Sequence, residues 1–220
     1  MLQLKSLKKS YHQGKETIEI FNDLNFTLEK SSRVAIMGKS GSGKSTFLSL
    51  VSGIIKSDKG DIYLNDTSYN DLSESEINDF RATNIGFIFQ NFHLVSYLNA
   101  LENVMLPAKV CNIPNPKEKA IELLSSVGLA HRLDHLPSEL SGGEKQRVAI
   151  ARALIHNPKI ILADEPSGNL DEETGIAVMD KLFELIKKND TTLILVTHSK
   201  DVANRCEKIY ELIHGNLKEI

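Results

Sequence analysis

Three short segments of the chain are almost continuously apolar. They cover residues 33–37, 159–163 and 192–196. Runs of this kind are typical of parallel strands that are buried on both faces. Each run is followed by a segment that we predict to be helical, at residues 44–52, 172–188 and 200–205. The alternation of strands and helices predicts an α/β core.

Further segments also have the pattern of strands. They are residues 2–7, 24–28, 60–64, 85–89 and 208–212. The early strands lack intervening helices, which predicts a small antiparallel sheet packed beside the α/β core. Residues 91–155 differ in character, because they contain no strong strand signal.

Helices are expected within residues 91–155, at residues 116–127 and 141–155. Pro116 suits the first position of a helix that Asn115 would cap. We therefore predict a mostly helical lobe, residues 91–155, inserted into a catalytic α/β core made of residues 1–90 and 156–220. The whole chain is expected to form a single domain of this type.

Composition narrows the class of protein. A chain of 220 residues fits one domain with a substantial core. Its net charge of −3 offers no strong basic field for nucleic acid, and its apolar runs are too short to span a bilayer. The first residues alternate like a strand, unlike a signal peptide. Cys111 and Cys206 match no metal or redox spacing and are read as free thiols. We expect a soluble, cytosolic protein.

Residues 38–45 read GKSGSGKS, which fits the phosphate-loop pattern G-x-x-x-x-G-K-[ST] between a predicted strand and a predicted helix. Glycines let backbone N–H groups surround a triphosphate, while the helix start and Lys44 add positive charge. The Ser45 hydroxyl is placed to hold Mg²⁺. A plain Gly/Ser-rich turn would not require Lys-Ser after the last glycine. The expected nucleotide-binding residues here are Gly38, Ser40, Gly41, Ser42, Gly43, Lys44, Ser45 and Thr46.

The apolar run at 159–163 ends in Asp164-Glu165-Pro166. Two acids at the end of a buried strand are unfavourable unless a cation or water occupies them. Neighbouring strand residues point to opposite sides, so we expect Asp164 to hold Mg²⁺ and Glu165 to polarise the attacking water. An acidic surface turn is the alternative.

The run at 192–196 ends in Thr197-His198. A lone histidine after a strand is more often structural than catalytic. Ligands gather at the carboxyl ends of parallel strands, however, so His198 is expected to contact the γ-phosphate or its water.

Residues 140–144 read LSGGE. Ser141 and Glu144 fit a capping box, which explains part of the pattern. It does not explain Gly142 and Gly143, because a helical glycine is about 1 kcal/mol less favourable than alanine. Bare backbone at a helix start suits an anion. Since Lys44 already holds the phosphates within this chain, the second helix start implies a second copy facing the first.

With these motifs in this order, the chain resembles ABC-type ATPases over essentially its whole length. The resemblance implies the P-loop ATPase fold of that family, with ATP and Mg²⁺ as cofactors. It assigns Tyr11 to stacking on adenine and Gln90 to contact with Mg²⁺, water and a membrane partner. Residues 167–171 match the loop that meets the opposite subunit, and His198 matches the switch histidine.

The resemblance further implies a mechanism and partners. Two ATP molecules would be sandwiched in a head-to-tail dimer, between the phosphate loop of one copy and Ser141, Gly142, Gly143 and Glu144 of the other. Hydrolysis would reopen the dimer and drive membrane permease subunits. The protein would then lie peripherally on the inner face of the cell membrane, bound through its permease and not to nucleic acid.

Within the family, the chain is most similar to the lipoprotein-releasing, macrolide-export and cell-division ATPases. The grounds are residues 168–171 (GNLD), the short C-terminus and the segment from Phe92 to Val104. Asn99, where threonine is more usual, and Leu136, where an aromatic residue often precedes Pro137, depart from the pattern. Two alternatives stay open: a soluble DNA-repair or ribosome-associated ATPase, and an ATP-gated regulatory switch that moves no substrate.

Overall fold

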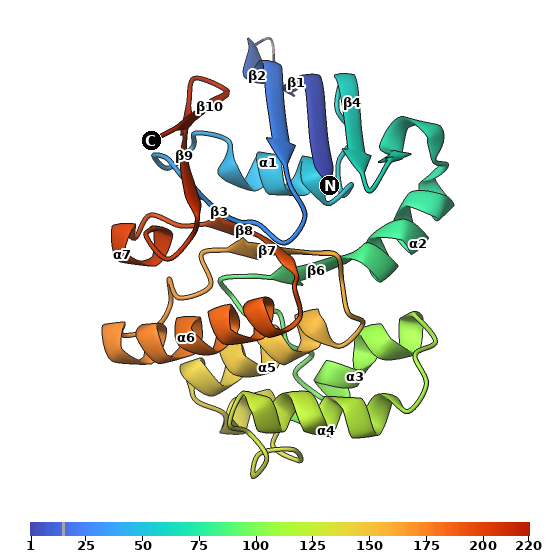
Figure 1. The fold of residues 1–220 in the computed structure, drawn as a ribbon, viewed down its shortest axis with the longest axis vertical. Coiled ribbons are helices and arrows are strands. Elements are labelled where there is room, and N and C mark those ends of the chain that lie inside the picture. Colours follow the sequence, from blue (N-terminus) through green and yellow to red (C-terminus); the bar gives the residue numbers. More distant parts are fainter. Residues whose placement is uncertain (15) are drawn as a thin grey trace. The chain divides into compact units, whose positions relative to one another are not determined.

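A computed structural model describes residues 1–14 and 16–220 (Figure 1). These residues form two compact units. The first unit consists of Met1–Arg81 and Thr192–Ile220, and the second of Ala82–Thr191. The predicted helical lobe, residues 91–155, lies inside the second unit. That unit also contains strands and a helix that we assigned to the core, so the predicted division into core and lobe stays a prediction.

The first unit contains the antiparallel sheet that the early strands predict. Its strands are β1 (Leu2–Gln13), β2 (Glu16–Leu28), β4 (Lys59–Leu64) and β5 (Thr67–Ser68), in the order β2-β1-β4-β5. Alternate residues of β1, such as Leu2 and Leu4, are fully buried, as expected for a sheet with one face on a core. Both β1 and β2 are longer than predicted, and their register places Tyr11 opposite Ile18.

The first unit also holds parallel strands in the order β9-β3-β8, with β10 antiparallel to β9. Their bounds are β3 (Arg33–Met37), β8 (Thr192–Val196), β9 (Lys208–Ile213) and β10 (Asn216–Glu219). The predicted bounds of β3 and β8 are confirmed, whereas β10 was not predicted. The helices that follow are α1 (Lys44–Val51), α2 (Glu74–Asn84), which ends beyond the unit boundary, and α7 (Lys200–Ala203), with a 3-10 turn at Tyr69–Asp71.

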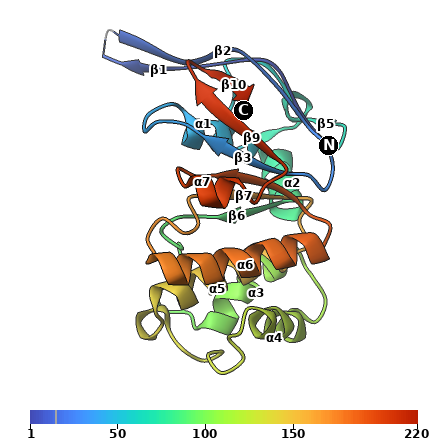
Figure 2. The same ribbon diagram turned by 60° about the vertical axis from the view of Figure 1, so that its left-hand side comes forward.

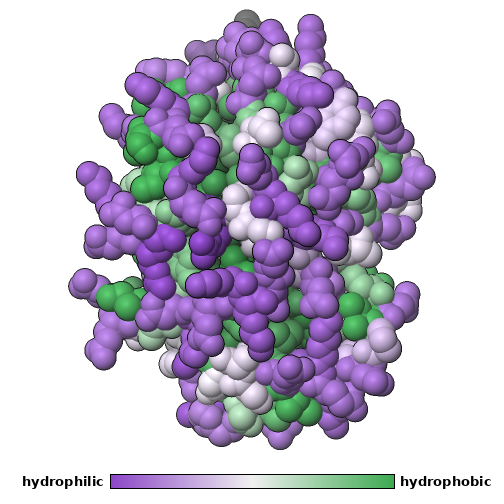
Figure 3. Space-filling view, viewed as in Figure 1, coloured by the Kyte–Doolittle hydropathy of each residue, from purple (hydrophilic) through white to green (hydrophobic). Residues whose placement is uncertain are grey.

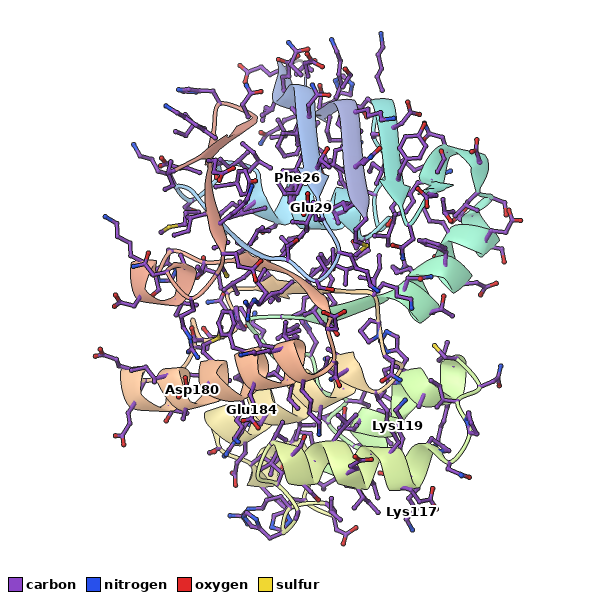
Figure 4. All side chains as sticks on the ribbon, viewed as in Figure 1. Phe26, Glu29, Lys117, Lys119, Asp180 and Glu184 are labelled. Atoms are coloured by element: carbon purple, nitrogen blue, oxygen red, sulfur yellow. The ribbon has the colours of Figure 1, made fainter. Side chains whose placement is uncertain are left out.

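Aromatic packing joins the elements of the first unit. Phe26 of β2, labelled in Figure 4, lies edge-on to Phe47 of α1, with 5.7 Å between ring centroids. The same ring lies edge-on to Tyr210 of β9 at 5.2 Å. Edge-to-face pairs of this kind are a favourable aromatic arrangement. This packing holds α1, and therefore the loop before it, against β2, and it holds β2 against β9.

The second unit combines two parallel strands with a group of helices (Figure 2). The strands are β6 (Ile85–Ile88) and β7 (Ile160–Asp164), and the helices are α3 (Ala100–Val110), α4 (Pro116–Ser126), α5 (Gly142–Leu154) and α6 (Glu172–Lys188), with a 3-10 turn at Pro137–Glu139. Helix α5 is central, because it contacts α3, α4, α6 and β6. We predicted α4, α5 and α6 but missed α3.

The surface is mainly polar. In Figure 3, hydrophilic side chains cover most of the face shown, and hydrophobic ones form small separate groups. Charged residues such as Lys117 of α4 and Glu184 of α6 contribute to this surface (Figure 4). Cys111 and Cys206 are both free thiols, as predicted. In the part of the chain described, no helix has the length and apolar composition required to cross a membrane.

Candidate functional site

The predicted phosphate loop forms the turn between β3, which ends at Met37, and α1, which begins at Lys44. Gly43 has φ of 102°, in the left-handed region that favours glycine. A Cβ atom there would also lie only 2.7 Å from Ile20 Cγ2. Gly41 is also left-handed, with φ of 77°, but a Cβ at that position would meet nothing within 4 Å. The loop is therefore tight against β2 on one side and open on the other.

The start of α1 lacks the side-chain cap that α3, α5, α6 and α7 carry. Its N-cap residue, Gly43, makes no side-chain hydrogen bond, and its first turn contains no acidic residue. By contrast, α6 is capped by Asp171, whose side chain accepts from Thr174 N. Backbone N–H groups at an uncapped helix start need another acceptor, and an anion supplies one.

Two side chains of the loop fit a phosphate ligand. Lys44 Nζ donates to the carbonyl oxygens of Gly38, at 2.8 Å, and Lys39, at 3.0 Å, so its ammonium group lies over the loop. Ser42 Oγ is buried without a hydrogen-bond partner among the described residues. An orphaned buried hydroxyl is rare in folded proteins, so a ligand oxygen near the loop would satisfy it.

A cavity of about 650 Å³ in the first unit adjoins the loop. It is lined by residues 39–42 of the loop, by β2 residues that include Ile18 and Ile20, and by residues 211–215. Cavities of this size hold small-molecule ligands. Tyr11 is 42% exposed and pairs across the strands with Ile18, which is 43% exposed. Sequence reasoning missed Ile18 and Ile20, although the alternation in residues 17–20 was a visible signal of a strand.

His198 lies at the edge of the parallel sheet from which the phosphate loop also leaves. It follows β8, which runs parallel to β3 with Ile36 opposite Val196, and Thr197 N donates to Ile36 O at 3.2 Å. Since β3 leads directly into the phosphate loop, His198 and that loop follow the carboxyl ends of adjacent strands. The structure thus brings together two of the predicted site segments. The His198 side chain is exposed to solvent.

The acidic pair and Gln90 share the corresponding edge of the second unit. Strands β6 and β7 are parallel, with Ile88 opposite Ala163, so Gln90 follows one strand end and Asp164 and Glu165 the other. Glu165 has φ of 46° and lies beyond β7. Strand alternation therefore does not govern its direction, so the reason that we gave for separate roles of the two acids was wrong.

Ser141 and Glu144 form the capping box that the sequence predicts. Ser141 Oγ accepts from Glu144 N at 3.2 Å, and the Glu144 carboxylate accepts from Ser141 N at 2.8 Å and from Arg132 Nε at 2.9 Å. The hydrogen bond from the Ser141 backbone, assisted by Arg132, holds the pKa of Glu144 below its usual value. The Glu144 carboxylate is thus hydrogen-bonded at the start of its own helix.

Gly142 and Gly143, the glycine pair of residues 140–144, have a packing role that sequence reasoning missed. A Cβ on Gly142 would lie 3.2 Å from Leu170 Cδ2, and one on Gly143 would overlap Thr174 Cγ2. These glycines therefore allow α5 to approach α6 and residues 167–171 closely. The close approach depends on residues distant in the chain, so no local pattern reveals it.

The proposed Mg²⁺ ligands are divided between the two units. Ser45 belongs to the first unit, while Gln90 and Asp164 belong to the second. Hydroxyl, amide and carboxylate oxygens are donors that Mg²⁺ accepts, so the residues fit the ion chemically. Among residues 1–14 and 16–220, no group of three or more His, Cys, Asp or Glu side chains is arranged to hold a metal.

A buried parallel strand, a glycine-rich loop with a lysine and an uncapped helix together define a P-loop nucleoside-triphosphate-binding protein. The family model described as ABC transporter matches residues 21–168. The chain therefore belongs to the ABC transporter family, and it is an ATPase subunit of that family, as predicted.

The relatives refine this result. The chain is 43% identical to the lipoprotein-releasing system ATP-binding protein LolD of Treponema denticola over 99% of its length and 97% of the relative's. It is 44% identical to LolD of Legionella pneumophila, with 99% and 96% covered. It is 41% identical to YbbA, an uncharacterised ABC transporter ATP-binding protein of Escherichia coli, with 100% and 97% covered. The predicted subgroup, which joins the lipoprotein-releasing ATPases with the macrolide-export and cell-division ATPases, is confirmed, and the relatives place the chain beside LolD.

A solved structure of the cassette MJ0796, described as a dimeric post-hydrolysis state bound to ADP and Pi, superimposes with a TM-score of 0.92. It is 39% identical, and the match covers 100% of this chain and 98% of that one. A second dimeric structure of MJ0796 gives a TM-score of 0.91 at 40% identity, with the same coverage. The predicted α/β fold of ABC ATPases is confirmed.

Proposed function

We propose that this chain dimerises head to tail around two ATP molecules and powers a membrane exporter or a lipoprotein-extraction complex. The observation that carries nucleotide binding is the uncapped start of α1, with the Lys44 ammonium lying over the loop. The relatives that release lipoproteins support the transport role. The loop supports ATP binding, and the names of the relatives support lipoproteins as one candidate class of cargo.

Within one copy, the phosphate loop binds the triphosphate. Backbone N–H groups of residues 38–46 donate to the phosphate oxygens, and Lys44 moves its donors from loop carbonyls to the phosphates. Tyr11 stacks on the adenine ring, and Ile18, opposite it on β2, extends the apolar surface. This arrangement holds the nucleotide beside the 650 Å³ cavity.

Ser45, Gln90 and Asp164 would hold Mg²⁺. The ion, when bound, neutralises charge on the β- and γ-phosphates. Glu165 accepts the proton of the attacking water, and His198 contacts the γ-phosphate or that water. The partner copy contributes its own Ser141–Glu144 helix start to the site, so hydrolysis requires the dimer. The dimeric MJ0796 structures support this arrangement.

The protein would be peripheral, on the inner face of the cell membrane, and held there by its permease. Exposed side chains on residues 91–110, such as Tyr97 at 80% and Val110 at 69%, are candidates for that contact. The alternative is an ATP-gated switch that acts on a membrane partner without moving substrate. Both functions use the same nucleotide site, so single-turnover coupling and the identity of the partner separate them.

The test uses Glu165→Gln, which removes the general base but keeps the shape of the side chain. We expect hydrolysis to slow by roughly 10²–10⁴-fold and the ATP-bound dimer to accumulate on size-exclusion chromatography. Glu184→Gln is the matched control, because Glu184 is an exposed glutamate on α6 paired with Lys181. The control should behave like the parent. If Glu165→Gln hydrolyses ATP at the parent rate, the general-base role is wrong.

The partner is then identified from the same variant. The tagged Glu165→Gln protein is purified from membranes in mild detergent with ATP, and the accompanying proteins are identified. A permease with few spans and a large outer domain supports export or extraction. A division or cell-wall regulator supports the switch. Recovery of the dimer without any membrane protein contradicts the transport function but not the ATPase.

A further inference from the structure

Asn169 connects two loops of the second unit through its side-chain amide. Its Nδ2 donates to the backbone carbonyl of Gln90 at 3.1 Å and to Asn91 Oδ1 at 2.8 Å. Its Oδ1 accepts from Gln90 Nε2 at 3.2 Å. Asn169 therefore uses both of its donors and its acceptor on residues that follow β6, even though it lies in the loop after β7.

This network fixes the orientation of the Gln90 amide. The backbone carbonyl of Gln90 can only accept, so Asn169 must turn Nδ2 towards it. Asn169 Oδ1 then faces the Gln90 side chain, and that oxygen can only accept. Gln90 must therefore present Nε2 to Asn169. Its Oε1, for which we find no hydrogen bond among the described residues, is left as the free end of the amide.

The chemical consequence concerns a divalent cation. Mg²⁺ takes oxygen ligands, so an amide can serve only through its carbonyl oxygen. A glutamine amide that is free to rotate presents its oxygen only part of the time. We propose that Asn169 is a positioning residue that binds Gln90 Nε2 and so presents Gln90 Oε1 to the metal. This inference rests on the proposed role of Gln90.

The neighbouring contacts make the effect of Asn169 local. Arg152 of α5 donates through its guanidinium to the carbonyl oxygens of Phe92, at 2.7 Å, and His93. These contacts hold the loop after Gln90 without Asn169. Gly168 lets the Gln90 side chain lie close, because a Cβ there would be 2.8 Å from Gln90 Nε2. Removing the exposed Asn169 side chain should thus free the Gln90 amide without unfolding either loop.

The first test is a double-mutant cycle of Asn169→Ala and Gln90→Ala. In Asn169→Ala, the Mg²⁺ concentration for half-maximal ATPase activity should rise about tenfold, as for other residues that orient metal ligands. The KM for ATP should stay within about twofold, because Lys44 is unchanged. Adding Asn169→Ala to Gln90→Ala should have no further effect. Asn78→Ala, which removes an exposed asparagine bonded to Arg81, is the control.

The second test needs no turnover. Chain labelled with ¹⁵N-glutamine, free of nucleotide, is studied by NMR, and the Gln90 side-chain signal is assigned by its loss in Gln90→Glu. The signal should shift in Asn169→Ala and stay in place in Asn78→Ala. An unchanged signal in Asn169→Ala overturns the proposal. Equal effects of Asn169→Ala with and without Gln90 also overturn it.

A failure of the proposed function gives a different result. If Gln90→Ala leaves the Mg²⁺ dependence unchanged, the role of Gln90 is wrong, and with it the use of Asn169 for metal binding. The NMR shift would then still show the amide contact. An inactive parent chain would instead count against the ATPase assignment itself.

Discussion

A Gly143→Ala substitution distinguishes between two explanations of the glycine pair at the start of α5. If the pair exposes backbone for an anion, a methyl group at 143 should impair ATP hydrolysis and leave folding intact. If the pair allows close packing, the same methyl should destabilise the fold, because it would overlap Thr174 Cγ2. Val178 Cγ2, at 3.9 Å from that methyl, is in ordinary contact. The conflict therefore comes from one methyl group of Thr174.

The size of the effect follows from two opposing contributions. Alanine is more favourable than glycine in a helix by about 1 kcal/mol. Overpacking a core destabilises by about 1–3 kcal/mol, and the overlap with Thr174 indicates the upper end of that range. We expect Gly143→Ala to lose about 2 kcal/mol of unfolding free energy. For a chain of this length, that corresponds to a fall of about 4–8 °C in melting temperature.

The assay pairs Gly143→Ala with Thr174→Ser. Serine keeps the hydroxyl and removes the methyl group, which alone should destabilise by about 1 kcal/mol. In the double variant the alanine methyl occupies the freed space, so the melting temperature should return to within about 4 °C of the parent. ATPase activity of the double variant then reports on the anion explanation. Full stability in Gly143→Ala alone, or no recovery in the double variant, would refute the packing argument.

Two further predictions concern charged side chains of α5. Replacing Arg152 with leucine removes charged donors from the Phe92 and His93 carbonyls and should lower the unfolding free energy by about 2–4 kcal/mol, measured by urea denaturation. Because the pKa of Glu144 is lowered in the folded chain, its contribution to stability is present above the ordinary value of 4.5 and is lost as the pH falls through the lowered value. Glu144→Gln should therefore be less stable than the parent at pH 7, with a difference that shrinks in acid; an equal difference at pH 7 and about pH 3 would contradict this reasoning.

The sequence predicts buried elements better than polar ones. Strands β3 and β8 and helix α6 have the predicted bounds, because each shows a strong apolar pattern. Helix α2 was missed, since only Ile77 of its residues is buried. Strand β10 pairs at a sheet edge, and only Leu217 in it is partly buried. Some elements have no apolar periodicity of their own and are stabilised by packing against their neighbours. The sequence carries little signal for such elements.

Helix α3 was missed for a different reason. Pro107 lies inside it, and proline in a helical segment argues against a helix. The signal at its other end was available, because Asn99 and Glu102 form a capping box. Asn99, the residue that departs from the family pattern, is therefore the N-cap, a role that asparagine fills as well as threonine.

Parts of the site could be predicted because their chemistry is local. The phosphate loop and the acids after β7 are contiguous motifs. The Asn169–Gln90 contact joins residues 79 positions apart, and the sequence near either residue does not predict it. The same holds for Gly143 and Thr174. Contacts between distant segments depend on the fold, so sequence reasoning supplied candidates for the reacting groups but not for the residues that would orient them.

These orienting contacts connect three segments of the second unit with one another: helix α5, the loop after β7 and the loop after β6. The first turn of α5 packs against Leu170 and Thr174, and Asn169 of the same loop holds Gln90. The last turn of α5, through Arg152, holds the residues just after Gln90. Helix α5 therefore contacts both loops, one at each end, and neither loop can move without changing its contact with α5 or with the other loop. In the proposed dimer, the nucleotide held by the second copy contacts Ser141 at the start of α5 in this copy. A displacement of α5 would then change the position of Gln90 through both contacts at once. This gives a physical reason for coupling between the two sites of the proposed dimer, because a rigid helix transmits displacement along its length.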